Sequence, residues 1–274
     1  GDLMAAISKF AGCNSANLQA LNTAVMILLP KREGASQLTE FRPISPIHNV
    51  AKLIAKILAR RLQPAMEGLV APCQSAFIKK RSILDSFMYV QAIIKTLKMK
   101  KTPAILLKID LAKAFDTVSW EFLIDLLCAR GFGRRWTNWI AGLLATSSTK
   151  IGINGDLSDT VYHRRGFRQG DPLSPLLFVI VMDSLARLIG AASRAQVLPA
   201  IGTVPMPHRI SMYADDIVLF INPSRNEMHA AITLLDLFQS VAGLRANWAK
   251  SAATPIACTE DQIGEAVVET DCKS

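Results

Sequence analysis

The sequence has too few cysteines, in the wrong pattern, for a protein held together by disulfides or by zinc. Its 274 residues include five cysteines, an odd number, at positions 13, 73, 128, 258 and 272. They form no C-x-x-C pair, and no spacing of Cys and His residues matches a zinc site. These absences exclude a disulfide scaffold and a zinc module, and they favour reduced thiols in an intracellular protein.

Also missing are a secretory leader pattern, an internal repeat, a low-complexity tract and an uninterrupted apolar run long enough to span a membrane. Asp183 and Arg187 interrupt the most apolar stretch, residues 175–192, which therefore predicts a buried amphipathic helix and no membrane partner. Hydrophobic residues, in contrast, make up 50% of the chain, enough for the large core of one or two domains. That share excludes a disordered basic tail.

Positive charge is concentrated in the first part of the chain. Residues 1–108 hold 16 Lys and Arg against 5 Asp and Glu, a net charge of +11. Residues 109–274 hold 15 against 17, a net charge of −2, and the two parts sum to +9. A basic first part suits a polyanion, although a solvated basic surface fits the composition equally well.

Apolar residues along one face predict a helix over residues 47–62. Its polar side carries a basic stripe of Lys52, Lys56 and Arg60. The stripe suits a phosphate backbone, and a face in contact with solvent fits it as well.

The rest of the chain alternates between helix and strand signals. In chain order, the pattern first predicts a helix capped by Ser82 and Asp85, a strand over 104–110 and a helix capped by Ser119. The apolar side of the first helix carries Phe87, Val90, Ile94 and Leu97. There follow a hairpin over 149–163 turning at Asn154-Gly155, a helix beginning at Asp171-Pro172, a hairpin of strands 209–213 and 217–221, and a helix over 227–241. This order is typical of an α+β fold, and we expect the helices to cover one face of an antiparallel sheet.

Acidic residues follow two of the predicted strands. Asp110 closes the strand AILLKID, and Asp215 and Asp216 occupy the tip of the later hairpin. Each position alone is explained by the preference of Asp for turns and caps. Together, at one edge of one sheet, they would lie within a few ångströms, where their charges repel unless a cation lies between them. Carboxylates bind Mg²⁺, and a pair of such ions clamps the reacting oxygens of a phosphoryl transfer, so the pattern predicts nucleotidyl transfer.

Six segments resemble motif blocks of reverse transcriptases, in the order in which that family has them. They are FRPIS (41–45), QSAFIKKRSILDS (74–86), KIDLAKAFDTVSW (108–120), GFRQGDPLSPLLF (166–178), YADD (213–216) and GLRANWAKS (243–251). The resemblance covers residues 22–258 and is nearest to the non-LTR (LINE-type) retrotransposon enzymes of plants. It implies RNA-directed DNA synthesis.

The resemblance implies a right-hand polymerase fold without its thumb. Residues 1–104 would form the fingers, 105–252 the palm, and 253–274 a truncated approach to the thumb. Two Mg²⁺ ions, for which Mn²⁺ can substitute, would be held by the palm. Their ligands would be Asp110, Asp215, Asp216 and the carbonyl of Leu111.

Further positions match the family's nucleotide and nucleic-acid contacts. Phe115 corresponds to an aromatic gate whose bulk leaves no room for a ribose 2′-hydroxyl. The other implied dNTP contacts are Lys31, Arg42, Gln169 and Gly170, the implied general acid is Lys250, and the implied primer or template contacts are Tyr213, Arg81, Lys52, Lys56 and Arg60.

The resemblance also implies partners. They are an RNA template, a DNA primer and dNTPs, together with endonuclease and thumb regions in the same full-length polyprotein. We expect this chain to be a part of that polyprotein, in the cytoplasm and nucleus.

Two other functions fit part of the pattern. An RNA-dependent RNA polymerase shares the palm, and Asp116 could take the place of its ribose-binding acid, but Phe115 and the RQGDPLSP segment argue against it. A catalytically silent remnant that only binds nucleic acid through its basic part is the alternative from a different class.

Overall fold

The computed structural model describes residues 7–8, 10, 12, 18–44, 48–153 and 155–267. The chain forms two compact units, residues 1–62 with 115–175 and residues 63–114 with 176–274. Each unit is therefore made from two separate stretches of sequence. The units group residues 63–104 with the strands that follow residue 104, and they group residues 115–175 with the start of the chain. The division into fingers (1–104), palm (105–252) and an approach to the thumb (253–274) stays a prediction.

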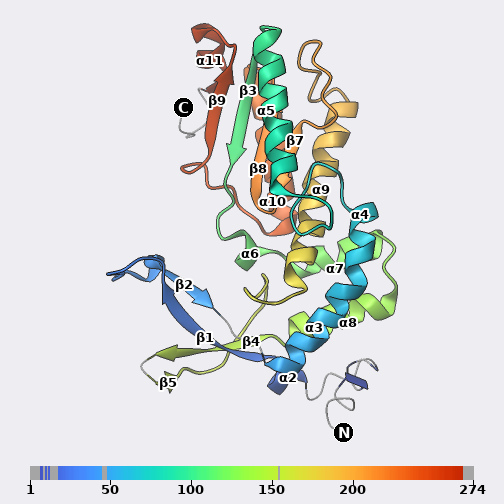
Figure 1. The fold of residues 1–274 in the computed structure, drawn as a ribbon, viewed down its shortest axis with the longest axis vertical. Helices are drawn as coiled ribbons and strands as arrows, with labels where there is room; N and C mark the ends of the chain where they lie inside the picture. Colours follow the sequence, from blue (N-terminus) through green and yellow to red (C-terminus); the bar gives the residue numbers. More distant parts are fainter. Residues whose placement is uncertain are drawn as a thin grey trace. The chain divides into compact units, whose positions relative to one another are not determined.

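The second unit is built on a four-stranded antiparallel sheet with the order β7-β8-β3-β9. Its strands are β3 (Ala104–Ile109), β7 (Ile210–Tyr213), β8 (Asp216–Ile221) and β9 (Ala252–Ile256) (Figure 1). The predicted strand and hairpin are thus confirmed. β3 is an interior strand with partners on both sides, which explains its nearly continuous apolar sequence.

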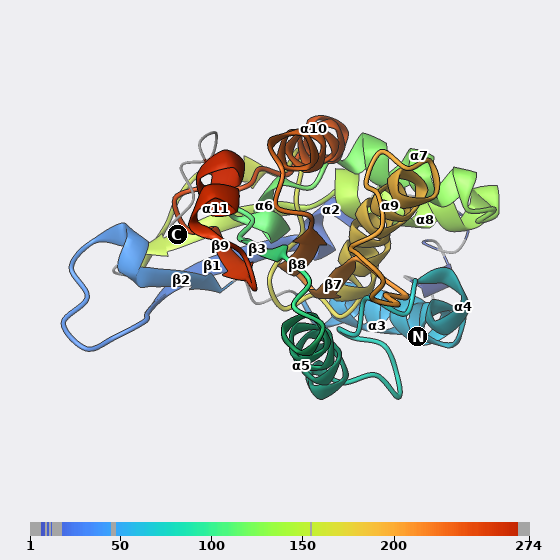
Figure 2. The same cartoon turned by 90° about the horizontal axis from the view of Figure 1, so that it is seen from above.

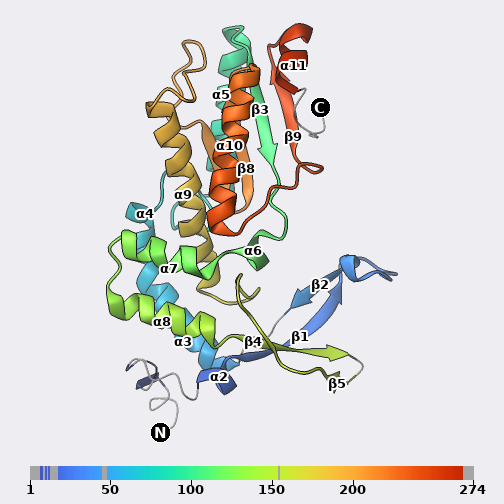
Figure 3. The same ribbon diagram turned by 180° about the vertical axis from the view of Figure 1, so that it is seen from behind.

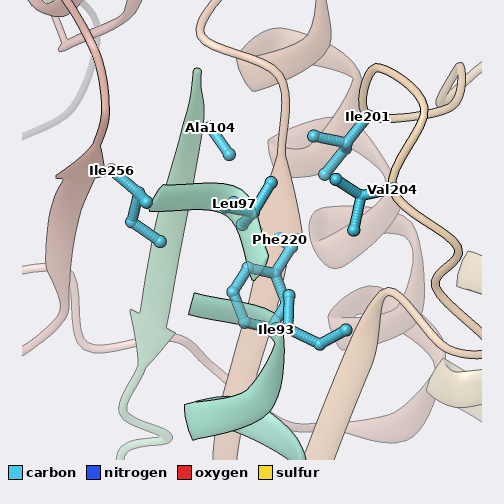
Figure 4. Close-up of a cluster of buried hydrophobic side chains, with 7 residues drawn as sticks. All are labelled: Ile93, Leu97, Ala104, Ile201, Val204, Phe220 and Ile256. Carbon is cyan, nitrogen blue, oxygen red and sulfur yellow. The ribbon is translucent and has the colours of Figure 1, made fainter. Parts of the chain in front are cut away.

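Helices lie on both faces of this sheet, which corrects the expectation of one covered face. Figure 2 shows α5 (Ile83–Met99) on one side and α10 (Arg225–Ala242) on the other. Phe220 of β8 packs with Ile93 and Leu97 of α5 in a buried cluster (Figure 4). The alternate positions of β8 are also buried, so both faces of the strand need a cover.

The predicted cap of α5 is confirmed, since Ser82 and Asp85 form a reciprocal capping box. Phe87, which its spacing places on the apolar side with Val90, Ile94 and Leu97, is 56% exposed and does not belong to the buried face. The face of α5 that meets the sheet carries Ser86, which donates to the Met212 carbonyl at 3.4 Å, and the buried Ile93 and Leu97.

The long apolar helix α9 (Ser174–Arg194) is a core helix. It is long and apolar enough to cross a membrane, yet 67% of its most apolar window is buried inside the protein. Asp183 is fully buried in it and accepts hydrogen bonds from the Ala71 amide at 2.7 Å and the Arg187 guanidinium at 2.6 Å. The charges that interrupt the apolar run therefore tie this helix to its neighbours.

Helix α9 begins later than predicted. Pro172 precedes the helix instead of occupying its first position, which is Ser174. The Asp171 carboxylate accepts hydrogen bonds from the Ser174 hydroxyl at 2.6 Å and the Leu173 amide at 3.2 Å. These bonds form a turn ahead of the helix, in which Asp171 still satisfies backbone and side-chain donors.

The first unit contains a mixed sheet with the order β2-β1-β4-β5, in which β6 also pairs with β4 (Figure 3). Its strands are β1 (Thr23–Pro30), β2 (Phe41–Ile44), β4 (Ser148–Ile153), β5 (Asp156–Leu157) and β6 (Val161–Tyr162). The predicted hairpin after residue 149 is confirmed, although Asn154 of its turn lies outside the described residues.

The helices of the first unit include the predicted one over residues 47–62, seen as α3 (Asn49–Leu62), and the helix capped by Ser119, seen as α7 (Trp120–Ala129). The others are α2 (Leu18–Leu21), α6 (Ala114–Thr117) and α8 (Arg134–Ala145), and the second unit also has α4 (Met66–Leu69) and α11 (Glu260–Val267). Ile54 and Leu58 of α3 are buried, as their spacing predicts.

Gly166 brings two backbone segments of the first unit into direct contact. Its φ is +74°, and a Cβ atom there would lie 2.3 Å from the Asp116 carbonyl oxygen. The Gly166 amide donates to Val118, and the Gly166 carbonyl accepts from the Trp120 indole at 2.7 Å. Only glycine can combine this backbone conformation with such an approach.

Gly166→Ala should therefore lower the free energy of unfolding by about 3 kcal/mol, since a left-handed conformation and a backbone clash add. Gly131→Ala is the matched control, because Gly131 also has a positive φ, +80°, but a Cβ atom at that position would meet no other atom within 4 Å. The control should cost about 1 kcal/mol. Urea denaturation measures both, and equal losses would contradict the role of close contact.

Candidate active site

Asp110 and Asp216 lie at the same end of two adjacent strands. β3 and β8 pair antiparallel, with Ile109 opposite Ile217. Continuing this register by one residue sets Asp110 opposite Asp216, and Asp215 precedes Asp216 at the tip of the β7–β8 hairpin. Carboxylates at facing positions of neighbouring strands repel, which destabilises the sheet locally. The sheet thus places three acidic residues at one end.

Among the three acidic residues, Asp215 has a shifted pKa. Partial desolvation, together with the negative charges of Asp216 and Asp110, raises the pKa of the Asp215 carboxyl above its usual value. The side chains of Asp215 and Asp216 are both exposed, and Asp110 is half-buried. All three are therefore at least partly accessible to solvent, and the charges of Asp110 and Asp216 act on Asp215.

The three acidic residues offer carboxylate oxygens at one end of the sheet. Within the described residues, no three His, Cys, Asp or Glu side chains gather closely enough to hold a metal ion by themselves. Their chemistry still fits a hard divalent cation, which takes carboxylate and carbonyl oxygens. Leu111 follows Asp110 in a bridge to Ala246, and its carbonyl as a ligand stays a prediction.

The segment that carries Lys250 is held against the segment that carries Asp110. The Asp110 amide donates to the Ser251 hydroxyl at 3.1 Å, and the Asp110 carbonyl accepts from the Asn247 amide at 2.8 Å. The Ala112 amide donates to the carbonyl of residue 245 at 2.8 Å. The GLRANWAKS block thus supports the Asp110 backbone, and Lys250 is exposed beside it in the chain.

In the first unit, Phe115 packs on the motif that contains Gln169 and Gly170. Its ring meets the ring of Phe167 edge to face, with centroids 6.1 Å apart, and its carbonyl accepts from the Phe167 amide at 2.6 Å. Gln169 and Gly170 are exposed, and Gly170 has a φ of +100° with open space around it. Phe115 is therefore held against the segment that leads into Gln169 and Gly170, and the gate and nucleotide contacts stay predictions.

Lys31 and Arg42 lie on the β1–β2 hairpin and are both exposed. Arg42 pairs with Leu29 in this hairpin, and Lys31 follows the last residue of β1, where its amide donates to the Glu40 carbonyl at 2.8 Å. The exposed side chains of Val25, Ile27 and Leu29 lie on the same face of β1.

The predicted nucleic-acid contacts differ in their surroundings. Lys52, Lys56 and Arg60 are exposed along α3, and Tyr213 ends β7 half-buried. Arg81, in contrast, donates to four backbone carbonyls in its own unit, at distances of 2.7–3.3 Å. They belong to Glu67, Val70, Ala71 and Gln74. This guanidinium has a structural role, and its predicted contact with primer or template stays a prediction.

Arg168 is a residue whose role the sequence pattern did not assign. It donates to the carbonyl and the side-chain oxygen of Asn22, and the Asn22 amide donates to the Leu143 carbonyl at 2.7 Å. Asn22 is fully buried. The Arg in the RQGDPLSP segment therefore fastens this motif to the start of β1, a connection over 146 residues that no local pattern reveals.

A cavity of about 1020 Å³ in the second unit lies away from the acidic residues. It is bounded by α4, α9 and residues 196–210, and neither Asp110, Asp215 nor Asp216 lines it. The candidate site is identified by the chemistry of Asp110, Asp215 and Asp216, which we call the acidic edge, and not by the size of a cavity.

A sequence profile of the family described as reverse transcriptase (RNA-dependent DNA polymerase) matches residues 29–262. The chain belongs to the reverse transcriptase family. Reverse transcriptases generally use divalent metal ions and bind an RNA template with a primer, which agrees with the acidic edge and the basic first part of this domain.

Known relatives place this reverse transcriptase domain among those of non-LTR retrotransposons. A 149 kDa protein of transposon TX1 from Xenopus laevis is 27% identical over 84% of this chain, and a Pol polyprotein of the retrotransposable element R2 from Popillia japonica is 29% identical over 85%. The chain spans only 17% and 32% of their lengths.

A solved structure shares the fold. Apo telomerase from Candida tropicalis, truncated from its C-terminal domain, aligns with a TM-score of 0.55 and 12% identity over 88% of this chain and 51% of that one. The α+β reverse transcriptase fold predicted from the motifs is therefore confirmed.

Proposed function

We propose that this domain catalyses template-directed addition of deoxynucleotides to a primer 3′-hydroxyl, with RNA as the template and release of pyrophosphate. The observation that carries the proposal is the β3–β8 register, which sets Asp110 opposite Asp216 with Asp215 beside them. A cluster of solvent-accessible carboxylates is what cation-assisted phosphoryl transfer requires.

Two Mg²⁺ ions, or Mn²⁺ in their place, would be held by Asp110, Asp215 and Asp216 with the Leu111 carbonyl. When bound, such ions stabilise the attacking and leaving oxygens of the transfer. The raised pKa of Asp215 supports this assignment, because a cation would relieve the repulsion that causes part of the shift. Lys250, on the segment that supports Asp110, would donate a proton to the departing pyrophosphate.

The first unit would supply the nucleotide contacts. Lys31 and Arg42, both exposed on the β1–β2 hairpin, suit the triphosphate, because an ammonium and a guanidinium both bind phosphate oxygens. Phe115 would exclude a 2′-hydroxyl, with Gln169 and Gly170 beside the incoming nucleotide. The gate role is supported by the packing of Phe115 on the motif that bears Gln169 and Gly170.

Template and primer would contact the basic surface and the end of β7. The exposed stripe of Lys52, Lys56 and Arg60 on α3 suits a phosphate backbone, and Tyr213 would lie near the primer end. Arg81 would contribute to these contacts indirectly, by holding the backbone that precedes α5.

For the full-length protein, we propose a retrotransposon polyprotein of the plant LINE type that also carries endonuclease and thumb regions. The protein would bind its RNA template in the cytoplasm and its DNA primer in the nucleus. The similarity to long Pol polyproteins supports a multidomain context.

Primer extension tests the proposal. The chain is incubated with poly(rA)/oligo(dT), dTTP and Mg²⁺, beside Asp215→Ala and with RNA binding measured in parallel. We expect extension by the native chain and none by the variant. Salt-sensitive RNA binding without any aspartate-dependent extension would instead favour the silent nucleic-acid-binding remnant.

Phe115→Val should admit ribonucleotides, because a smaller side chain opens space beside the sugar 2′ position. We expect discrimination between dNTP and rNTP, measured as the ratio of kcat/KM values, to fall by about a hundredfold or more. Phe122→Val, in α7 of the same unit, is the matched control and should keep the native ratio. Unchanged selectivity in Phe115→Val would remove the gate assignment.

A further inference from the structure

Gln74 is fully buried and uses both ends of its amide on one residue of the YADD turn. Its Oε1 accepts a hydrogen bond from the Ala214 amide at 3.0 Å, and its Nε2 donates to the Ala214 carbonyl at 3.3 Å. The same Oε1 also accepts from the Ala76 amide at 3.0 Å. A side chain 140 residues away thus satisfies both backbone groups of the residue before Asp215.

The backbone around Gln74 is joined to the same hairpin. Gln74 forms a parallel bridge with Met212 of β7. The Met212 amide donates to the Cys73 carbonyl at 2.7 Å, and the Ser75 amide donates to the Met212 carbonyl at 3.2 Å. The Gln74 carbonyl is in turn held by Arg81 at 2.7 Å. Gln74 is therefore fixed at both its main chain and its side chain.

Ala214 needs such support because it adopts a left-handed conformation, with a φ of +55°. For a residue with a Cβ atom this conformation costs roughly 1–2 kcal/mol, so the turn would relax if nothing held it. Ala214 is buried, and its own side chain carries no polar group that could stabilise the turn. The Gln74 amide supplies the missing donor and acceptor.

We propose that Gln74 is a positioning residue for the acidic edge: by fixing Ala214 in its left-handed conformation, it sets the position of the Asp215 carboxylate. The inference rests on the proposed polymerase function for its kinetic consequence. A buried Gln that only satisfies nearby backbone groups is the alternative. It predicts lower stability but no specific effect at the hairpin tip.

Gln74→Met keeps the length of the side chain and removes both hydrogen bonds to Ala214. We expect kcat for primer extension to fall by about ten- to a hundredfold, the effect of a small misplacement of a reacting group, while KM for dNTP changes less than about threefold. Gln74→Glu keeps the hydrogen-bond acceptor and loses the donor, so its kcat should lie between the kcat of the native chain and that of Gln74→Met. A kcat within twofold of native in Gln74→Met would overturn the proposal.

The control is Tyr89→Phe, which removes the bonds between Tyr89 and His208, just ahead of β7 and away from its YADD end. It should lose comparable stability and keep kcat. Ala214→Gly, combined with Gln74→Met, should restore most of the lost kcat, because glycine adopts a positive φ without strain. A merely structural Gln74 predicts no such rescue.

Hydrogen exchange tests the proposal independently of catalysis. The Ala214 amide should exchange about tenfold faster in Gln74→Met than in the native chain and stay protected in Tyr89→Phe. If the native chain proves inactive, the proposed function fails while this measurement still decides the role of Gln74. Equal exchange in all three proteins would overturn it.

Discussion

Asp215→Asn should reduce primer extension by about a thousandfold or more while leaving the folded domain as stable as the native chain, or more stable. The loss of activity follows from removing a charge that the reaction needs. The gain in stability follows from the raised pKa of Asp215: its ionised form is disfavoured in the folded state by desolvation and by Asp216 and Asp110. Asn keeps the shape and removes the repulsion.

The effect of Asp215 on stability should depend on pH in a definite direction. A carboxyl with a raised pKa binds its proton more tightly in the folded chain, so the free energy of unfolding falls as pH rises from the unfolded value through the folded one. The stability difference between Asp215→Asn and the native chain should therefore be larger at neutral pH than at about pH 4. Asp236→Asn, an exposed change on α10, is the control for both readouts. A destabilised Asp215→Asn at neutral pH would contradict the electrostatic account.

Glu227→Gln should lower the free energy of unfolding by about 3–5 kcal/mol, because it leaves the Arg209 charge buried without a counter-ion. Both side chains are almost completely buried, and Glu227 pairs with Arg209 while its second oxygen accepts from Asn222 at 2.6 Å. The pair joins α10 to the start of the β7–β8 hairpin. Urea denaturation measures the loss.

The double variant Arg209→Met with Glu227→Leu separates the pair from the packing around it. It removes both charges together, so it should cost less than Glu227→Gln alone, since replacing a buried pair by apolar side chains is often nearly neutral. The buried Nη2 of Arg209 has no hydrogen-bond partner among the residues described, which adds to the expected relief. A double variant less stable than the single one would show that the pair is strongly favourable.

Local patterns were sufficient wherever a signal lies within a few residues. The capping box at Ser82, the cap at Ser119, the β7–β8 hairpin and the buried face of α3 all appear where the sequence predicts them. Hydrogen bonds over three residues and apolar periodicity are properties of the chain itself, and tertiary packing did not override them.

Predictions failed where a partner far along the chain decides the outcome. Phe87 lies on the apolar side by spacing, but the face of α5 that meets the sheet runs through Ser86, Ile93 and Leu97 and leaves Phe87 exposed. The strands β1 and β2 had no sequence signal that we recognised, and β1 is completed by parallel pairing with β4, more than 120 residues away. Such non-local pairing has no counterpart in local periodicity.

The order of residue types was enough to establish the acidic residues, their place at strand ends, the uneven charge and the family to which the chain belongs. The folded chain was needed to establish that residues 63–114 join the C-terminal part, that Arg168 fastens Asn22 and that Gln74 holds Ala214. The physical reason is that residue type fixes which chemistry is available, whereas a buried amide or guanidinium bonds to whichever backbone group the fold brings within about 3 Å.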